Sequence, residues 1–114
     1  MKLIFDTTKI IKKGEKAVKI KVKVKNLPDL GPLTKVLKNK VFNTILDSAG
    51  IKTGYEIVDN LIIGGNTNKA IFLVNNDEDI IKIINRITKL YEDTIKEIQR
   101  IRSWRGNKKI EINY

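Results

Sequence analysis

Residues 17–25 read Ala-Val-Lys-Ile-Lys-Val-Lys-Val-Lys, a strict alternation of apolar and basic side chains. Successive side chains of a β-strand point to opposite faces, so this stretch predicts a strand with one apolar face and one basic face. The β-branched valines and isoleucine also favour a strand over a helix. We expect the apolar set to be buried and the basic set, which we call the lysine row, to be exposed. The apolar set is Val18, Ile20, Val22 and Val24, and the lysine row is Lys19, Lys21, Lys23 and Lys25.

Hydrophobic patterns on either side of this strand predict the neighbouring elements. Residues 2–12 form a first strand, and a turn at Gly14 joins it to the lysine strand. Pro32 suits the first turn of an amphipathic helix, which Gly50 ends. Two more strands follow at residues 55–63 and 69–75, joined by a loop rich in Gly and Asn. Residues 58–61 are a competing turn site, which leaves the register of this hairpin open.

A long apolar stripe beyond this hairpin predicts a second helix, capped by Asn76 or Asp77 and continuous to about Trp104. Such a helix would be roughly 40 Å long, whereas a domain of this size is about 30 Å across. Its last turns should therefore overhang the body or meet a second subunit. Gly106 is expected to end the helix, and residues 108–114 alternate as a closing edge strand.

The predicted order is ββαββαβ, which indicates an α+β two-layer sandwich with both helices on one face of a largely antiparallel sheet. All 114 residues fit one domain. From the lysine strand onward, this order resembles that of ferredoxin-like RNA-processing proteins. Examples are the small sheet-and-helix subunit of archaeal ribonuclease P and the small dimerising subunit of the KEOPS tRNA-modification complex. The resemblance is in element order, and it implies a fold of ferredoxin-like character.

The net charge of +10 is concentrated at one end of the chain. Residues 1–40 hold twelve lysines against three acids, a balance of +9, whereas residues 41–114 hold eleven basic residues against ten acids, a balance of +1. Clustered charge of one sign indicates a polyanionic partner, although basic residues can also serve solubility alone.

The composition argues against catalysis. The chain has no histidine and no cysteine, and it contains no phosphate-binding glycine motif. We therefore expect no enzyme activity, no cofactor and no metal. The acids of residues 77–79 are interpreted as complements of a helix dipole, with a divalent cation as the weaker alternative. Asp6, Glu56 and Asp59 would form a carboxylate group only if the sheet brought them together.

Two further groups of residues are candidates for binding. Guanidinium groups and an indole near the end of the long helix suit phosphates and unpaired bases, although the indole also fits the apolar stripe. These candidates are Arg102, Trp104, Arg105, Lys108 and Lys109. Asn66, Thr67 and Asn68 could hydrogen-bond a ligand from a hairpin tip, but ordinary turn residues are the simpler interpretation.

The sequence thus predicts a non-catalytic nucleic-acid-binding module, with RNA ahead of DNA, that contacts phosphates through its lysine-striped sheet. The alternative is a protein-interaction subunit, either a homodimer or part of a larger complex, such as a viral or plasmid accessory protein. Binding to a membrane surface ranks third, since no apolar stretch could span a bilayer and no apolar helix face is left to insert. Without a recognisable signal peptide, a cytoplasmic location is expected.

Overall fold

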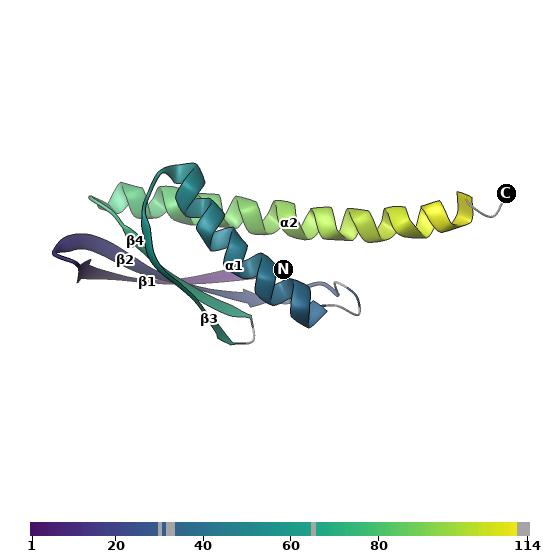
Figure 1. The fold of residues 1–114 in the computed structure, drawn as a ribbon, viewed down its shortest axis with the longest axis horizontal. Helices are drawn as coiled ribbons and strands as arrows, with labels where there is room; N and C mark the ends of the chain where they lie inside the picture. Colours follow the sequence, from purple (N-terminus) through teal and green to yellow (C-terminus); the bar gives the residue numbers. More distant parts are fainter. Residues whose placement is uncertain (30, 32–33, 65, 112–114) are drawn as a thin grey trace.

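The chain forms strands and helices in the order ββαββα (Figure 1). The computed structural model describes residues 1–29, 31, 34–64 and 66–111, with the backbone alone for residues 34–39 and 101–111. Its elements are β1 (Lys2–Lys12), β2 (Glu15–Lys25), α1 (Thr34–Thr53), β3 (Ile57–Gly64), β4 (Thr67–Leu73) and α2 (Asp77–Glu111). The first hairpin turns at Lys13 and Gly14, which both have positive φ, as predicted for Gly14.

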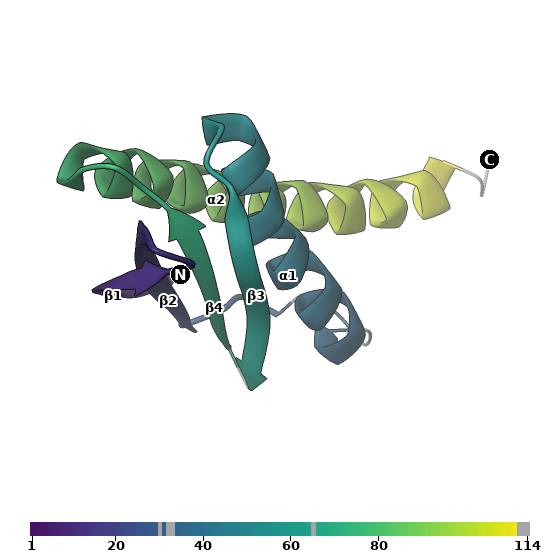
Figure 2. The ribbon, with the colours of Figure 1, turned by 60° about the vertical axis from the view of Figure 1, so that its left-hand side comes forward.

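The strands make one antiparallel sheet in the order β1-β2-β4-β3, so β2 and β4 are central and β1 and β3 are the edges. Both helices cover the same face of this sheet (Figures 1 and 2). The predicted α+β two-layer sandwich is therefore confirmed. No helix of the described residues lies on the open face of the sheet.

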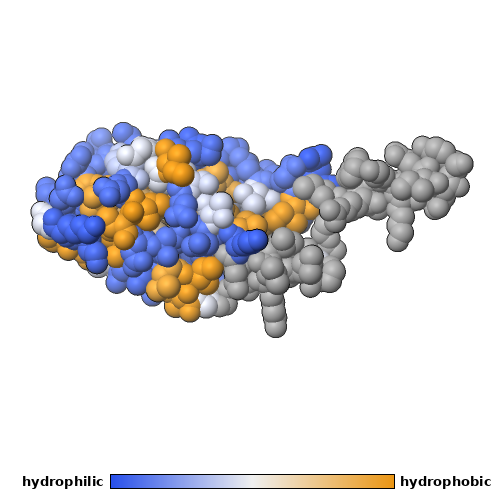
Figure 3. Space-filling model, in the orientation of Figure 1, coloured by the Kyte–Doolittle hydropathy of each residue, from blue (hydrophilic) through white to orange (hydrophobic). Residues whose placement is uncertain are grey.

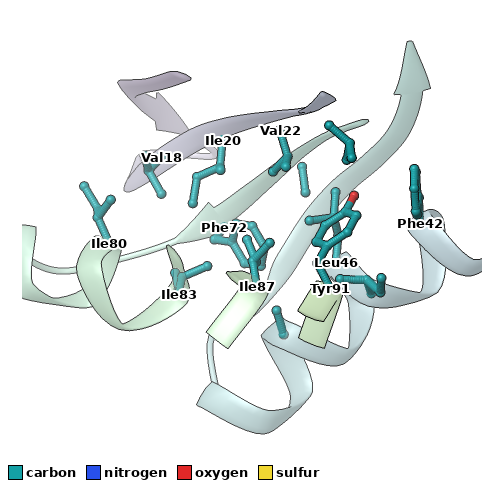
Figure 4. Close-up of a cluster of buried hydrophobic side chains, with 14 of the residues drawn as sticks. Val18, Ile20, Val22, Phe42, Leu46, Phe72, Ile80, Ile83, Ile87 and Tyr91 are labelled. Atoms are coloured by element: carbon teal, nitrogen blue, oxygen red, sulfur yellow. The ribbon is translucent and has the colours of Figure 1, made fainter. Parts of the chain in front are cut away.

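The core forms where the apolar face of β2 meets the two helices. Val18, Ile20, Val22 and Val24 are each no more than 2% exposed, which confirms their predicted burial. They belong to one cluster with Ile83, Ile87 and Tyr91 of α2 and with Phe42 and Leu46 of α1 (Figure 4). The rings of Phe42 and Tyr91 pack with their centroids 5.0 Å apart. Because this cluster buries every second residue of β2, the alternation of the strand fixes which face is covered.

The helix α1 ends later than its sequence predicts. It continues through Gly50 to Thr53, and Gly54 then takes a φ of +80° and accommodates the chain reversal. Gly50 is needed for a different reason: a Cβ at this position would lie 2.7 Å from Cδ1 of Ile57 and 3.0 Å from the carbonyl oxygen of Tyr55. The glycine therefore allows the close approach of α1 to the start of β3.

The second hairpin also differs in detail from its prediction. β3 runs through residues 58–61 as a strand, with irregular pairing on either side of Val58, so the competing turn does not form. Thr67 and Asn68 are residues of β4, and Asn68 is fully buried opposite Val22. Their interpretation as residues of a hairpin tip is therefore wrong.

The prediction of a closing strand at residues 108–114 is wrong for residues 108–111, the part of this segment that the structure describes. α2 continues through Gly106 to Glu111, whereas residues 112–114 lie outside the described part of the chain. Both edges of β2 are already taken, by β1 on one side and β4 on the other. A C-terminal strand would thus have only the outer edges of β1 and β3 to pair with. The predicted helix start at Pro32 also lies outside the described residues.

Within the described part of the chain, no helix is long and apolar enough to cross a membrane. The longest one, α2, carries charged side chains along its length.

We predict that Gly50→Ala destabilises the protein although alanine is the better helix former. The added methyl group must displace Ile57 or the backbone at Tyr55, and such overpacking outweighs the helix-propensity gain by about 1–2 kcal/mol. Urea unfolding measures the change. Ser48→Ala in the same helix is the control and should be neutral or slightly stabilising. A Gly50→Ala variant as stable as the wild type would contradict the role given to this contact.

Candidate nucleic-acid interface

The lysine row lies on the open face of the sheet, as predicted, but its members are not equally exposed. Lys23 and Lys25 are exposed, whereas Lys19 and Lys21 are half-buried. The difference arises because β2 is central: Lys19 has Thr8 of β1 on one side and Ile71 of β4 on the other. Ile71 is only 6% exposed although neither α1 nor α2 covers this face. Lysine stems cover such apolar surface while their ammonium groups stay in water.

The register adds two lysines that the sequence alone did not single out. Lys2 pairs with Lys25, and Lys69 pairs with Lys21, so both lie on the open face. Side chains directly opposite each other in antiparallel strands are neighbours on one face. Lys69 was missed because cross-strand register depends on the turn and the core and cannot be read from β4 alone. The lysine row and these two make six lysines on the open face, and Lys12, which pairs with Glu15, lies on the same face at the end of the first hairpin.

Acids offset this charge only weakly. Asp6 lies opposite Lys21, and Asp59 lies opposite Ile71 at the β3 edge. Among the described residues, none of the six lysines forms a salt bridge; the three that occur are Lys9–Asp77, Lys89–Asp93 and Arg100–Glu97. The open face therefore has unpaired cations in a row, with a spacing of roughly 6.6 Å along β2. Such a surface attracts polyanions from water.

Base stacking has no platform on the described part of this face. Phe42, Phe72 and Tyr91 are in the core, and Phe5 and Tyr55 pack against it. An exposed ring is what stacks a base in sheet-based RNA readers. The open face can therefore hold a phosphate backbone, but its described residues offer no exposed ring with which to select bases.

An apolar border lies beside the lysines at the β3 edge. Leu61 and Ile63 are about half exposed, at 49% and 50%. Figure 3 shows hydrophobic surface over the lower end of β3 in this view. The open face is thus basic along β2 and apolar along its β3 edge.

The basic segment near the C-terminus is not part of this face. Arg102, Trp104, Arg105, Lys108 and Lys109 are residues of α2, in the helical layer, and their side chains lie outside the described residues. In Figure 1 this end of α2 continues well beyond the end of β1 and β2. The backbone therefore does not bring the segment and the lysine row onto one surface.

One of the three acids at the start of α2, Asp79, takes part in the helix cap. Asp79 is buried, and its Oδ2 accepts hydrogen bonds from the backbone N–H groups of Asn75 (2.9 Å) and Asn76 (3.1 Å). The Asn76 side chain accepts in return from the N–H of Asp79 at 3.2 Å, which makes a capping box. The hydroxyl of Tyr55 donates to Asp79 Oδ1 at 2.5 Å. The predicted position of Asp79 in the first turn of α2 is thus confirmed, and Asn76 is the cap.

These bonds favour the ionised form of Asp79. The hydrogen bond from Tyr55, followed by the backbone N–H of Asn75, lowers the pKa of this carboxyl group below its ordinary value of 3.8. The same bond raises the pKa of Tyr55. Tyr55 had no motif in the sequence, because only the tertiary structure brings it next to a residue 24 positions later.

The other acids do not form a shared site. Asp6 and Asp59 lie on β1 and β3, at opposite edges of the sheet, so the predicted carboxylate group does not assemble. Within the described residues, no group of three or more His, Cys, Asp or Glu side chains is placed to hold a metal ion.

No protein-family model, curated protein or solved structure matches this chain.

We predict that Asp79 makes the protein sensitive to acid. Because its folded-state pKa lies below 3.8, its stabilising effect is complete above about pH 5 and is lost as pH falls through the folded-state pKa. Asp79→Asn should lower the free energy of unfolding at pH 7 and flatten its fall between about pH 5 and pH 2. Chemical denaturation at several pH values measures both effects.

Tyr55→Phe removes one hydrogen bond to Asp79. It should therefore also flatten the fall of the unfolding free energy at acid pH, but by less than Asp79→Asn does. Glu92→Gln, an exposed acid on the same helix, is the control for loss of one charge. An unchanged pH profile in Asp79→Asn would contradict the stabilising role of this carboxylate.

Proposed function

We propose that this protein is a small, non-catalytic nucleic-acid-binding module that holds RNA or single-stranded DNA by its phosphate backbone. The observation that carries the proposal is the row of lysines on the uncovered sheet face, none of which has a salt-bridge partner among the described residues. Lysine ammonium groups bind phosphates as point charges. The proposal places the protein in the cytoplasm, where single-stranded RNA is available.

The geometry favours affinity over sequence selection. A flat row of cations can contact successive phosphates of a flexible nucleic-acid strand. Reading the bases, in contrast, requires stacking rings or paired hydrogen-bond donors and acceptors. The half-buried stems of Lys19 and Lys21 restrict these side chains, so less conformational entropy is lost on binding than for fully free lysines. Binding should therefore tolerate any sequence and depend strongly on salt.

We predict that log K falls linearly with log salt with a slope of about −3 to −6, for four to eight phosphate contacts at about 0.7 each. Lys21→Gln/Lys23→Gln should weaken binding to every sequence alike and flatten the slope by about 1.4. Fluorescence anisotropy with mixed-sequence RNA and DNA oligonucleotides measures both quantities.

The charge-matched control is Lys16→Gln/Lys40→Gln. Both side chains are exposed; Lys16 alternates onto the same side of β2 as Val18, and Lys40 belongs to α1. This control should leave the slope nearly unchanged. Absence of binding at low salt would reject the proposal and leave an assembly subunit as the better function.

Two observations favour that second candidate, a protein-interaction subunit. Leu61 and Ile63 are exposed on an edge strand, where another chain can pair or pack. In addition, α2 is 35 residues long and the molecule extends over 64 Å. Its last turns reach past both the sheet and α1 (Figure 1). A second copy of the chain could pack on this part of α2.

If this second candidate holds, light scattering should give about 26 kDa, twice the monomer mass of 13.1 kDa. Deleting residues 101–114 should then yield a monomer, because the described core ends at Ile95 and Ile98. A full-length protein that remains at 13.1 kDa at high concentration would reject dimerisation through α2.

A further inference from the structure

A second basic surface lies on the outer side of α2. The buried side chains of this helix include Ile80, Ile83, Ile87, Tyr91 and Ile95. At 100° per residue, Lys82, Arg86 and Lys89 fall about half a turn away from that stripe. All three are exposed. They therefore face away from the sheet, while the lysine row faces away from the helices.

These three cations line a groove beside the end of α1. The groove has a volume of about 550 Å³, and its walls are Thr53, Lys82, Asn85, Arg86 and Lys89. Thr53 is the last residue of α1, so the groove is built where the two helices meet. Every side chain that lines it is polar, and none is acidic. We call this surface the α2 basic groove.

The charge of the groove is only partly offset by nearby acids. Lys89 forms a salt bridge with Asp93 at 3.2 Å, in which both side chains are more than half exposed. Lys82 lies close enough to Asp79 to help lower the pKa of that carboxyl group. Arg86 forms no salt bridge with a described residue, and its planar guanidinium group suits two oxygens of one phosphate. The amide of Asn85 and the hydroxyl of Thr53 provide further donors.

We propose that the α2 basic groove is a second binding site for nucleic-acid phosphates, and that one molecule bridges two strands by holding one on each face. This inference rests on the proposed function, because the lysine row must hold the first strand. The molecule measures 24 by 20 Å across its two shorter axes. Two strands on opposite faces are thus separated by the sandwich.

The test uses two short oligonucleotides of about ten nucleotides, within the size range of single-strand-binding sites. One carries biotin and the other carries fluorescein, and the full-length protein is mixed with both at low salt. Streptavidin beads then capture the biotin strand, and the fluorescein strand retained with it measures bridging. Anisotropy with the fluorescein strand alone measures simple binding.

Three proteins are compared. Lys82→Gln/Arg86→Gln/Lys89→Gln removes the charge of the groove, and Lys13→Gln/Lys16→Gln/Lys40→Gln removes three exposed lysines outside both basic surfaces. The groove variant should lose bridging by about tenfold or more while its affinity for one strand changes by about twofold, as expected when one of two sites is lost. The wild type and the second variant should both bridge. Circular dichroism confirms that each variant is folded.

The outcomes separate this inference from the proposed function. Binding of one strand without bridging by the wild type would overturn the second site and leave the proposed function intact. Bridging that persists in the groove variant would also overturn it, because two lysine rows in a dimer would then explain the result. Absence of any binding would reject both proposals.

Discussion

The two-faced character of β2 is the constraint on which the rest of the structure depends. Its four apolar side chains are almost completely buried against both helices, and the lysines alternate with them. A shift of one residue would place four ammonium groups in the core, at a cost of several kcal/mol each. This penalty fixes the face of β2 that the helices cover, whereas the turn at Lys13 and Gly14 sets the register of β1. The basic surface is thus a consequence of how the core forms.

The position of β1 explains the shape of the molecule. The first hairpin fills one edge of β2, and β4 fills the other, so both central strands have two neighbours. The C-terminal part of the chain has no place beside β2, and the residues predicted as a closing strand continue α2 to Glu111 instead. Trp104 and the basic residues around it are therefore in the helical layer, away from the open face of the sheet.

The start of α2 determines which of its side chains point outward. Asn76 and Asp79 cap the helix, Tyr55 holds Asp79 from the connection before β3, and the N–H of Val74 donates to the carbonyl of Lys16 at 3.0 Å. These bonds tie the first turn of the helix to the sheet. The rotation of α2 about its axis then follows from the burial of its isoleucine stripe, and the cations of the α2 basic groove face away from the sheet for the same reason.

The sequence by itself determined β1, β2 and the burial of alternate residues in β2, because these features follow from strong local periodicity. The order of the elements then predicted both helices on one face of the sheet. The sequence also placed the lysine row on the open face. The tertiary structure alone decided that Lys2 and Lys69 join this row, that Tyr55 binds Asp79, and that Gly50 lies against Ile57. Each of these depends on contacts between residues far apart in the chain. The end of α2 was decided in the same way: residues 108–111 alternate like a strand, but periodicity cannot reveal that both sides of the central strands are already occupied.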